Sequence, residues 1–451
     1  MISPSATDFR HWVARLKLFV LLGALCPGVV FAFNCVSKVT GNWGDATTWN
    51  NCNGTVPQDG DSVIILNTHN VTLNVTTQTL ASLTLNSGGT ITGASGKDIF
   101  LGGNLVNNGT LNVAAGSSTN TIYLVGDAVT SSLTSTWSGT GTWNLDNVDL
   151  NGSGSNKCTG SCKLEVTGTP TLSFANSGIF AGNSSPTRVF NSNGNAAFTV
   201  NLNRAGNQNV QTNGVTFPNL ILSGSGNKSP SSGTFNVLGN LTVSSGVTVD
   251  LTAHDPVTNI GGSLSNAGTL TASNNAARLL TISGDLVNSG TYTGNSSSVN
   301  LAGNFDNTGT FTSGSGVWTL NGGSPKSLLH GAPSFQNLVM NGAGFTLSSG
   351  SLTVTTLLTL TSGNITTGAN AVIAAANCPG SISRTGGHVD GNLRLTFPAA
   401  STTCTFHVGS GAYAPIVITN TGAGTLTGST IGADLPPSGT SGINQIGRAH
   451  V

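Results

Sequence analysis

The chain has 451 residues, of which only 7% are Asp, Glu, Lys or Arg, against about a quarter in an average globular domain. Its 62 glycines follow no Gly-X-Y period, which excludes collagen, and 37% hydrophobic residues are too many for a disordered linker. Because 15 basic residues are balanced by 15 acidic ones with no basic patch, we expect no binding to nucleic acid. Recurrent Thr, Val and Ile favour an all-β fold of short strands.

Residues 1–32 have the pattern of a signal peptide. Three basic residues precede an apolar run from Leu18 to Val30, which is shorter than the ~20 residues that span a membrane. A small-residue cleavage site ends at Ala32, so we expect a secreted or cell-surface protein whose mature chain begins near Phe33. No other apolar run in this fragment is expected to span a membrane.

Six cysteines follow the signal peptide, and an even number in an exported protein indicates disulfides. Six cysteines allow 15 pairings, and proximity in the sequence favours three local couples. A zinc site is the weaker alternative for the central couple, which has no histidine or second cysteine pair nearby. The expected pairs are Cys35 with Cys52, Cys158 with Cys162, and Cys378 with Cys404.

Residues 33–65 are predicted to be the N-terminal cap of a solenoid, because an open coil would expose unpaired strand edges. Trp43 and Trp49 are candidates for stacking on a glycan, although packing inside the cap is the favoured interpretation. Asp59 and Asp61 are weak candidates for a calcium site. A turn is favoured there, because no further oxygen ligands follow at the spacing of a calcium loop.

Residues 66–375 repeat one phrase, Gly, a polar residue, an apolar residue and then Asn-x-Gly-Thr. A period of about 20 residues is typical of one turn of a parallel β-helix, or β-solenoid. Alternation places Leu and Val inside, and we expect Asn and Thr outside, where they form ladders along the stack. Copies begin at Gly103, Gly262, Gly284 and Gly303, with a partial copy at Gly239.

A longer repeat of 118 residues overlies the short one between about residues 200 and 344. Phe217-Pro218-Asn219-Leu220 matches Phe335-Gln336-Asn337-Leu338, and the flanking positions match at the same displacement. Duplication of a block of coils extends a stalk easily, whereas it would rarely benefit a single catalytic pocket.

Asp146 and Asp149 are the best candidates for catalytic carboxylates, and they are weak ones. Enzymes of the β-helix type that cleave polysaccharides use carboxylates as acid and base. Three residues apart in a strand, the two aspartates face opposite sides, and a basic partner would have to come from Lys163 or Arg188 on a neighbouring coil. We therefore expect no enzyme, and we expect neither a cofactor nor a resident metal.

The last two segments differ from the repeats. Residues 376–445 have longer strands and more aromatic residues, which predicts a β-sandwich-like module that is truncated here. Residues 446–451 are what a common sequencing adapter encodes in one frame before a stop codon. We expect them to be an artefact and the natural chain to continue past Gln445.

Two segments resemble known modules. The order Gly-x-Trp, Thr-Trp, Val-Pro-x-x-Gly-Asp-x-Val between Gly41 and Val63 resembles the opening of bacterial secreted β-helix adhesins and of the G8 domain. Phe-x-Val-Gly at 406–409, before Tyr413, resembles a β-sandwich module that follows such solenoids. The whole is similar to bacterial proteins of the MshQ type, associated with biogenesis of the mannose-sensitive haemagglutinin (MSHA) pilus, and equally to other β-helix adhesins. The resemblance implies an architecture and no catalytic residue.

The leading hypothesis is a structural or adhesive surface protein, an adhesin or pilus-associated stalk without catalytic activity. Its partners would be a surface glycan, matrix or pilus components. The first alternative is a β-helix carbohydrate-active enzyme or carbohydrate-binding protein. The second is an ice-binding protein, which requires a Thr-x-Thr row at every coil on one exposed face. The uneven spacing of 19 to 23 residues between copies argues against that row.

Overall fold

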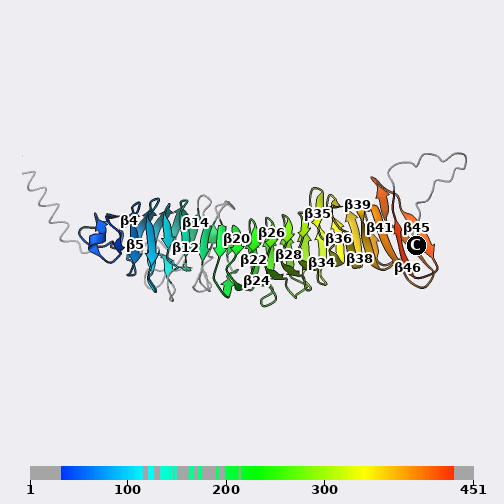
Figure 1. Cartoon of the computed structure of the whole chain (residues 1–451), viewed down its shortest axis with the longest axis horizontal. Coiled ribbons are helices and arrows are strands. Elements are labelled where there is room, and N and C mark those ends of the chain that lie inside the picture. Colours follow the sequence, from blue (N-terminus) through cyan, green and yellow to red (C-terminus); the bar gives the residue numbers. More distant parts are fainter. Residues whose placement is uncertain are drawn as a thin grey trace, which may run out of the picture.

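The computed structural model shows one elongated parallel β-solenoid, which confirms the predicted all-β class (Figure 1). Each turn of the chain contributes up to three short strands, and each strand pairs in parallel with its counterpart one turn later. The one helical segment in the described part is the short 3-10 helix η1 (Ala46–Thr48). The structure describes residues 32–114, 120–125, 133–145, 147–149, 162–166, 171–174, 189–191, 199–212 and 215–430.

The strands form three faces that run along the solenoid. The first face contains β1 (Asn34–Ser37), β4 (Ser62–Ile65), β6 (Thr79–Leu85), β8 (Ile99–Asn107), β11 (Leu133–Ser138), β14 (Cys162–Val166), β16 (Val189–Asn191), β19 (Thr216–Phe217), β22 (Thr234–Val237), β25 (Val257–Ile260), β28 (Leu279–Ile282), β31 (Ser298–Leu301), β34 (Val317–Leu320), β36 (Ser334–Asn341), β38 (Leu352–Ser362) and β40 (Ile382–Arg384).

The second face continues without interruption from the N-terminal cap to the other end. It contains β2 (Gly41–Asn42), β5 (Asn70–Leu73), β7 (Thr90–Gly93), β9 (Thr110–Asn112), β12 (Thr142–Leu145), β15 (Thr171–Phe174), β17 (Thr199–Leu202), β20 (Asn219–Leu222), β23 (Leu241–Val243), β26 (Leu264–Asn266), β29 (Leu286–Asn288), β32 (Phe305–Asn307), β35 (Lys326–His330), β37 (Phe345–Leu347), β39 (Ile365–Asn377), β41 (Val389–Phe397) and β43 (Val408–Ser410).

The third face is formed partly by separate strands and, beyond them, by the first residues of β36 and β38 and the later residues of β39 and β41, which pair with one another. Six of its strands form a separate sheet, β18 (Gln208–Val210), β21 (Gly226–Pro230), β24 (Val247–Asp250), β27 (Thr269–Thr271), β30 (Thr291–Thr293) and β33 (Thr310–Thr312). Nearer the N-terminus, β10 (Thr121–Leu124) and β13 (Asn147–Asp149) occupy this face beside the first residues of β6 and β8.

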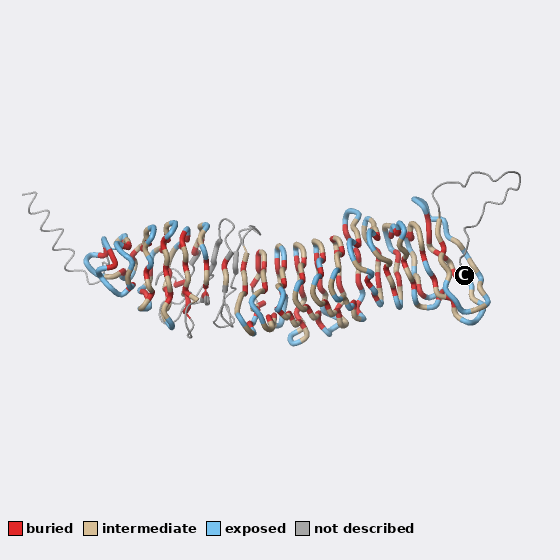
Figure 2. Tube along the Cα trace, viewed as in Figure 1, coloured by how far each residue is buried: buried red, intermediate tan, exposed pale blue. Residues whose placement is uncertain are grey.

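The core follows the alternation expected from the sequence. Buried residues alternate with more exposed ones along most strands of the stack (Figure 2). On the second face Leu241, Leu264, Leu286 and Phe305 lie in register and are each at most 1% exposed. Burying one such side chain stabilises the fold by about 1.5–3 kcal/mol. Because each side chain packs on its counterparts in the adjacent turns, no single turn has a complete core.

The asparagine of the repeated Asn-x-Gly-Thr phrase lies inside the solenoid, which corrects the expectation that it faces outward. Asn266 and Asn288 are fully buried and occupy the corner between the second and third faces. The Nδ2 of Asn266 donates to Oδ1 of Asn288 at 2.8 Å, and Nδ2 of Asn288 donates to Oδ1 of Asn307. Each of the two also donates to a threonine carbonyl of the following turn, Thr291 or Thr310. The asparagine ladder therefore supplies hydrogen-bond donors to backbone carbonyl groups at a buried corner, where strand pairing does not supply them.

The glycine of the same phrase is required because successive turns lie too close together at the corner to leave room for a Cβ atom. A Cβ atom at Gly290 would collide with the carbonyl oxygen of Gly268, and one at Gly309 would collide with that of Gly290. Thr291 N donates to that Gly268 oxygen at 2.8 Å, so the corner backbones are tied as well as close. The phrase thus encodes a corner.

The 118-residue repeat is not a whole number of turns. Leu202 lies in β17 on the second face, whereas its match Leu320 lies in β34 on the first face. The short phrase shows the same freedom, because Asn107 is buried between the first and second faces and donates to Thr142 O at 2.9 Å. The repeats therefore preserve the order of strand and corner, not a fixed face.

Both ends of the stack carry antiparallel strands and a disulfide. At the N-terminal end β3 (Trp49–Asn50) pairs with β1, and Cys35 is bonded to Cys52. At the other end Cys378 is bonded to Cys404. Two of the three expected disulfides are thus confirmed; Cys158 and the side chain of Cys162 lie outside the described residues.

The predicted boundary at residue 376 does not coincide with the end of the solenoid. Strands β41 and β43 continue the parallel stack of the second face beyond it. The antiparallel strands there are β42 (Thr402–Phe406), β44 (Ala412–Tyr413), β45 (Ile416–Asn420) and β46 (Gly424–Gly428). Strand β46 pairs antiparallel with β41, and β45 pairs antiparallel with β42. A separate β-sandwich stays a prediction.

The asparagine ladder makes a specific prediction for stability. Substituting Asn288→Leu removes the partner of Asn266 Nδ2, Asn307 Oδ1 and Thr310 O at once, and each buried polar group left unpaired costs about 1–3 kcal/mol. Amide hydrogen exchange in β26 to β33 should accelerate, while distant turns change little, because a solenoid is stabilised by neighbouring turns. Val287→Ser, on the outward side of the same strand, is the control. Equal protection in both variants would show that the ladder is dispensable.

Candidate functional site

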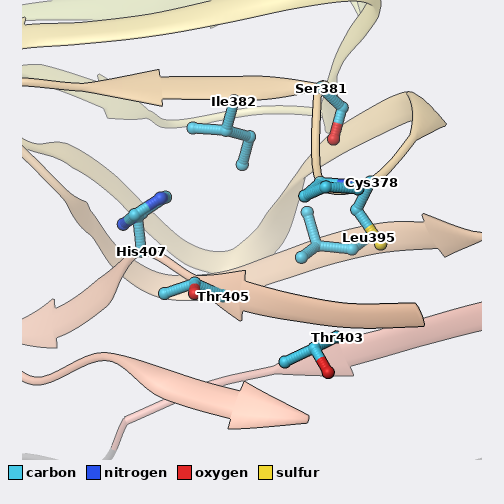
Figure 3. A pocket seen from close by; sticks show the side chains of 8 residues that line it. Cys378, Ser381, Ile382, Leu395, Thr403, Thr405 and His407 are labelled. Carbon is cyan, nitrogen blue, oxygen red and sulfur yellow. The ribbon is translucent and has the colours of Figure 1, made fainter. Parts of the chain in front are cut away.

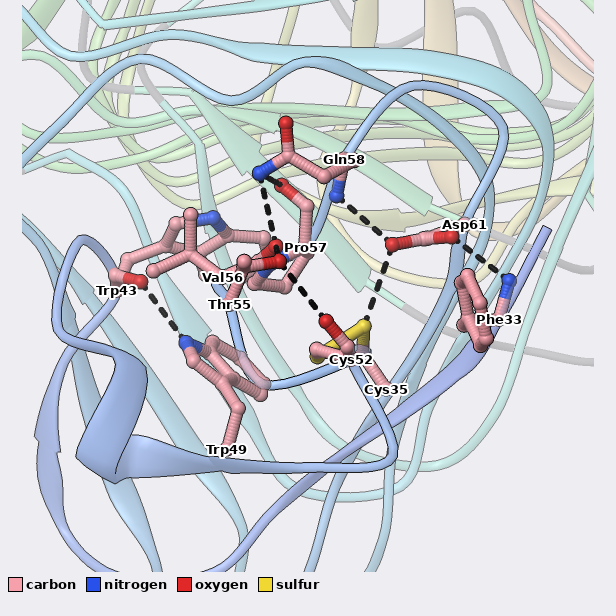
Figure 4. Close-up of a disulfide and its surroundings, with 10 residues drawn as sticks. All are labelled: Phe33, Cys35, Trp43, Trp49, Cys52, Thr55, Val56, Pro57, Gln58 and Asp61. Carbon is pink, nitrogen blue, oxygen red and sulfur yellow. Dashed lines mark hydrogen bonds between the residues drawn. A yellow bond between two sulfur atoms is a disulfide. The ribbon is translucent and has the colours of Figure 1, made fainter. Parts of the chain in front are cut away.

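The N-terminal cap does not present its tryptophans to solvent (Figure 4). Trp43 is 1% exposed and Trp49 is 5% exposed, and their rings meet edge to face at 4.9 Å. Nε1 of Trp49 donates to the Trp43 carbonyl oxygen at 2.8 Å. Stacking on a sugar requires an open ring face, so the two residues form the cap's core, as the favoured interpretation of the sequence had it.

The two acidic candidates in the cap differ sharply in their surroundings. Asp59 is exposed, whereas Asp61 is 1% exposed and accepts backbone N–H bonds on both carboxylate oxygens. Phe33 N donates to Oδ1 at 2.7 Å and Gln58 N to Oδ2 at 2.8 Å. Asp61 therefore organises the cap backbone. Across the described residues, no group of three or more His, Cys, Asp or Glu side chains is placed to hold a metal.

The catalytic candidates cannot be assembled from the described side chains. Asp146 and Arg188 lie outside the described residues. The backbone of Asp149 lies in β13, paired in register with Tyr123 of β10, and the backbone of Lys163 lies in β14. Their side chains also lie outside the described part, so the expectation that Asp146 and Asp149 face opposite sides stays a prediction.

A cluster of titratable side chains lies at the C-terminal end of the stack. His388 and His407 precede the paired residues Val389 and Val408, so the two histidines occupy equivalent positions in successive turns. Nδ1 of His407 lies 2.8 Å from the hydroxyl oxygen of Tyr413, and the guanidinium of Arg384 lies 3.5 Å from the centre of the same ring. His388 is 5% exposed, and its Nε2 has no hydrogen-bond partner.

Burial lowers the pKa of both histidines below the usual value. The charge of Arg384 lowers both pKa values further, and Asp390 opposes this shift at His388 only. Both imidazoles are therefore neutral at pH 7, in a form that can donate and accept hydrogen bonds. Both histidines lie in one segment of the sequence, and the register between turns brings them to equivalent positions.

The cavity beside this cluster is small (Figure 3). It has a volume of about 100 Å³, and Ser381, Thr403, Thr405 and His407 contribute its polar lining. The Ser381 hydroxyl is buried without a partner. Sites for small molecules typically measure about 300–1,000 Å³. This cavity fits a few water molecules or a group the size of a hydroxymethyl, not a sugar ring.

A buried lysine was not anticipated. Lys228 of β21 is fully buried, and its Nζ donates to the carbonyl oxygen of Arg204 at 2.7 Å and to Oε1 of Gln208 at 3.0 Å. Burial, together with the charge of Arg204, lowers the pKa of Lys228 to about 8. The alternation along β21 could have indicated this burial, because Lys228 occupies an inward-facing position between the more exposed Asn227 and Ser229. Its acceptors lie in the turn that precedes β18 and at the first residue of β18, so the lysine ties this turn to the strand.

The outward side of the third face carries two columns of short polar side chains. Thr248, Thr269, Thr291 and Thr310 lie in register in one column. Asp250, Thr271, Thr293 and Thr312 lie in register in the other. Of the residues between the columns, Val249, Leu270 and Tyr292 are buried and Phe311 is partly buried. Three successive strands, β27, β30 and β33, therefore have Thr-x-Thr in register on one sheet.

Comparison of the chain with protein-family models, with curated proteins and with solved structures gave no match. The fold alone defines the class, a capped parallel β-solenoid protein. In the described part, no helix is long and apolar enough to cross a bilayer.

The histidine cluster predicts a pH dependence at the C-terminal end. The pKa values of His388 and His407 are lowered in the folded state, so below about pH 6.5 the unfolded chain binds protons that the folded chain does not. Protection of β41 and β43 amides should be complete above that pH and fall as the pH is lowered. His407→Gln should flatten this dependence, whereas His254→Gln on an exposed distant loop should not. Identical pH profiles of wild type and His407→Gln would refute the assignment.

Proposed function

We propose that this protein is an exported, cell-surface structural or adhesive rod without catalytic activity. One observation carries the proposal: the second face is an unbroken parallel stack from β2 in the N-terminal cap to β43 near the other end. Such a stack separates its two ends by a set distance, about 4.8 Å for each turn. Both ends are fastened by disulfides, which persist in oxidising, extracellular environments.

Further support comes from the sequence. The signal peptide pattern in residues 1–32 indicates export. The resemblance of the cap to bacterial β-helix adhesins, and of the chain as a whole to MshQ-type proteins, favours a surface role. Duplication of coils is compatible with a stalk, because a change in the number of coils alters the length of the stalk without removing a functional site. The partners we propose are a surface glycan, matrix or pilus components.

Removing two complete turns tests the rod. Gly262 and Gly303 begin equivalent copies two turns apart, so deletion of residues 262–302 rejoins the chain at matching positions. We expect the variant to fold, to be exported and to be shorter by about 10 Å in small-angle scattering, because each turn adds about 4.8 Å.

The function itself is tested on a printed glycan array with immobilised pilus and matrix fractions beside it. We expect the full chain and the shortened chain to bind the same probe equally, because a spacer keeps its ligand when turns are lost. Release of reducing sugars from a polysaccharide panel would contradict the non-catalytic proposal. Loss of binding in the shortened chain would place the binding surface on the deleted turns.

The threonine columns favour ice binding as a second candidate function. The requirement was a Thr-x-Thr row at every coil on one exposed face. Three successive strands, β27, β30 and β33, have Thr-x-Thr in register, whereas the neighbouring β24 has Thr248-Val249-Asp250. The uneven spacing of copies does not disturb the columns, because the extra residues lie in corners such as Leu251–Pro256 after β24. Hydroxyl and methyl groups recur about 4.8 Å apart along the stack and about 6.6 Å apart across it. Of the eight column positions only Asp250 is charged.

Thr293→Lys is expected to abolish any uptake of the protein into growing ice, because a long charged side chain interrupts the columns of threonines. Thr281→Lys places the same substitution on the first face of the same turn and should leave uptake unchanged. The measurement is the fraction of protein partitioned into a slowly grown ice ball, with an unrelated protein of similar size as reference. Wild-type uptake at the level of that reference would exclude this function.

A further inference from the structure

Asp61 is the buried carboxylate of the N-terminal cap, and its charge has no side-chain counter-ion. No Lys, Arg or His side chain in the described part forms an ion pair with it. Its oxygens accept from the neutral amides of Phe33 and Gln58, and the Cys35 sulfur, 3.3 Å from Oδ2, belongs to a disulfide and has no proton to donate. A buried charge is costly unless it is paired, so the missing cation needs an explanation.

The closest donor to this carboxylate is the nitrogen of Phe33, at 2.7 Å from Oδ1 (Figure 4). Phe33 is also the residue at which the sequence predicts the mature chain to begin. It is held from two other directions, because Ser62 N donates to its carbonyl oxygen at 2.9 Å and its ring packs on the core. Ala32, on the other side of the predicted cut, is exposed.

We propose that cleavage between Ala32 and Phe33 supplies the missing counter-ion, so that the N-terminal ammonium of the mature chain pairs with Asp61. A signal peptidase of the exporting cell adds water across the peptide bond: Ala32 leaves with the carboxylate, and the Phe33 nitrogen takes up protons to become an ammonium. The 2.7 Å contact then changes from a neutral amide hydrogen bond to a charge-assisted ion pair, which is roughly twice as strong. Export thereby completes the cap. The inference rests on the proposed export of the chain.

The mechanism follows from where the contact lies. Phe33 enters β1, which pairs with β4, and Asp61 directly precedes β4. The ion pair therefore fastens the first strand of the stack to the second, next to the Cys35–Cys52 disulfide. A chain that retains its signal peptide has only the weaker amide contact. The unprocessed cap should accordingly open more readily than the processed one.

Defined N-termini test the proposal. Full chains that begin at Phe33 with a free amine, at Phe33 with an acetylated amine, and at Ala32 are compared by amide exchange of Gln58 and Ser62. We expect exchange to be slower in the free-amine chain by on the order of 10-fold, and the advantage to vanish in Asp61→Asn. Asp59→Asn, which removes an exposed charge two residues away, should preserve it. Equal exchange in all three chains would overturn the proposal.

Mass spectrometry of the N-terminal peptide of the exported protein completes the test. A start at Phe33 supports the ion pair, and a start elsewhere contradicts it even if the protein is exported. Neither result depends on adhesion, so the glycan-array outcome and this outcome can fail separately. If Asp61→Asn prevents folding of the cap, the acetylated chain, which keeps every side chain, still decides the question.

Discussion

The constraint on which this structure depends is the hydrogen-bonded register between successive turns. Parallel pairing places each residue directly over its counterpart about 4.8 Å away, so a property of one position becomes a column along the molecule. Apolar positions become a continuous core, Leu241 to Phe305 on the second face being one case. Outward threonines become columns on the third face, and the corner asparagines become an internal ladder.

Much of this architecture could be predicted from the sequence. Alternation of apolar and polar residues predicted the strands, and the short period predicted their stacking. Alternation placed Asn288 on the same side as the buried Leu286, two residues earlier, but an amide was expected to face water. What the sequence did not reveal is the hydrogen-bond partner that satisfies the buried amide, the threonine carbonyl of the next turn. The equivalent positions of His388 and His407 likewise follow from the register between turns and not from proximity in the sequence.

Because charged residues are scarce in this chain, each buried charged side chain can be assigned a structural role. In a chain with 7% charged residues, Lys228 and Asp61 are placed inside the structure, one in the interior of the solenoid and the other in the cap. Both lie where the backbone leaves the regular stack: Lys228 fastens the turn before β18, and Asp61 binds the amides that lead into β1 and β4. Charges therefore act here as fasteners of irregular backbone, while the regular turns are held by ladders and apolar contacts.

The turns differ in length, and yet the residues on their faces stay in register. Intervals of 19, 22 and 23 residues between copies would destroy any property that depended on sequence spacing. In three dimensions the surplus is accommodated at corners, as in the loop Leu251–Pro256, while Thr248, Thr269 and Thr291 stay in register. A corner can thus lengthen or change its chemistry without disturbing the faces beside it. For the same reason the 118-residue repeat could shift by one face, from Leu202 to Leu320, and still fold, because the unit that is copied is a strand with its corner.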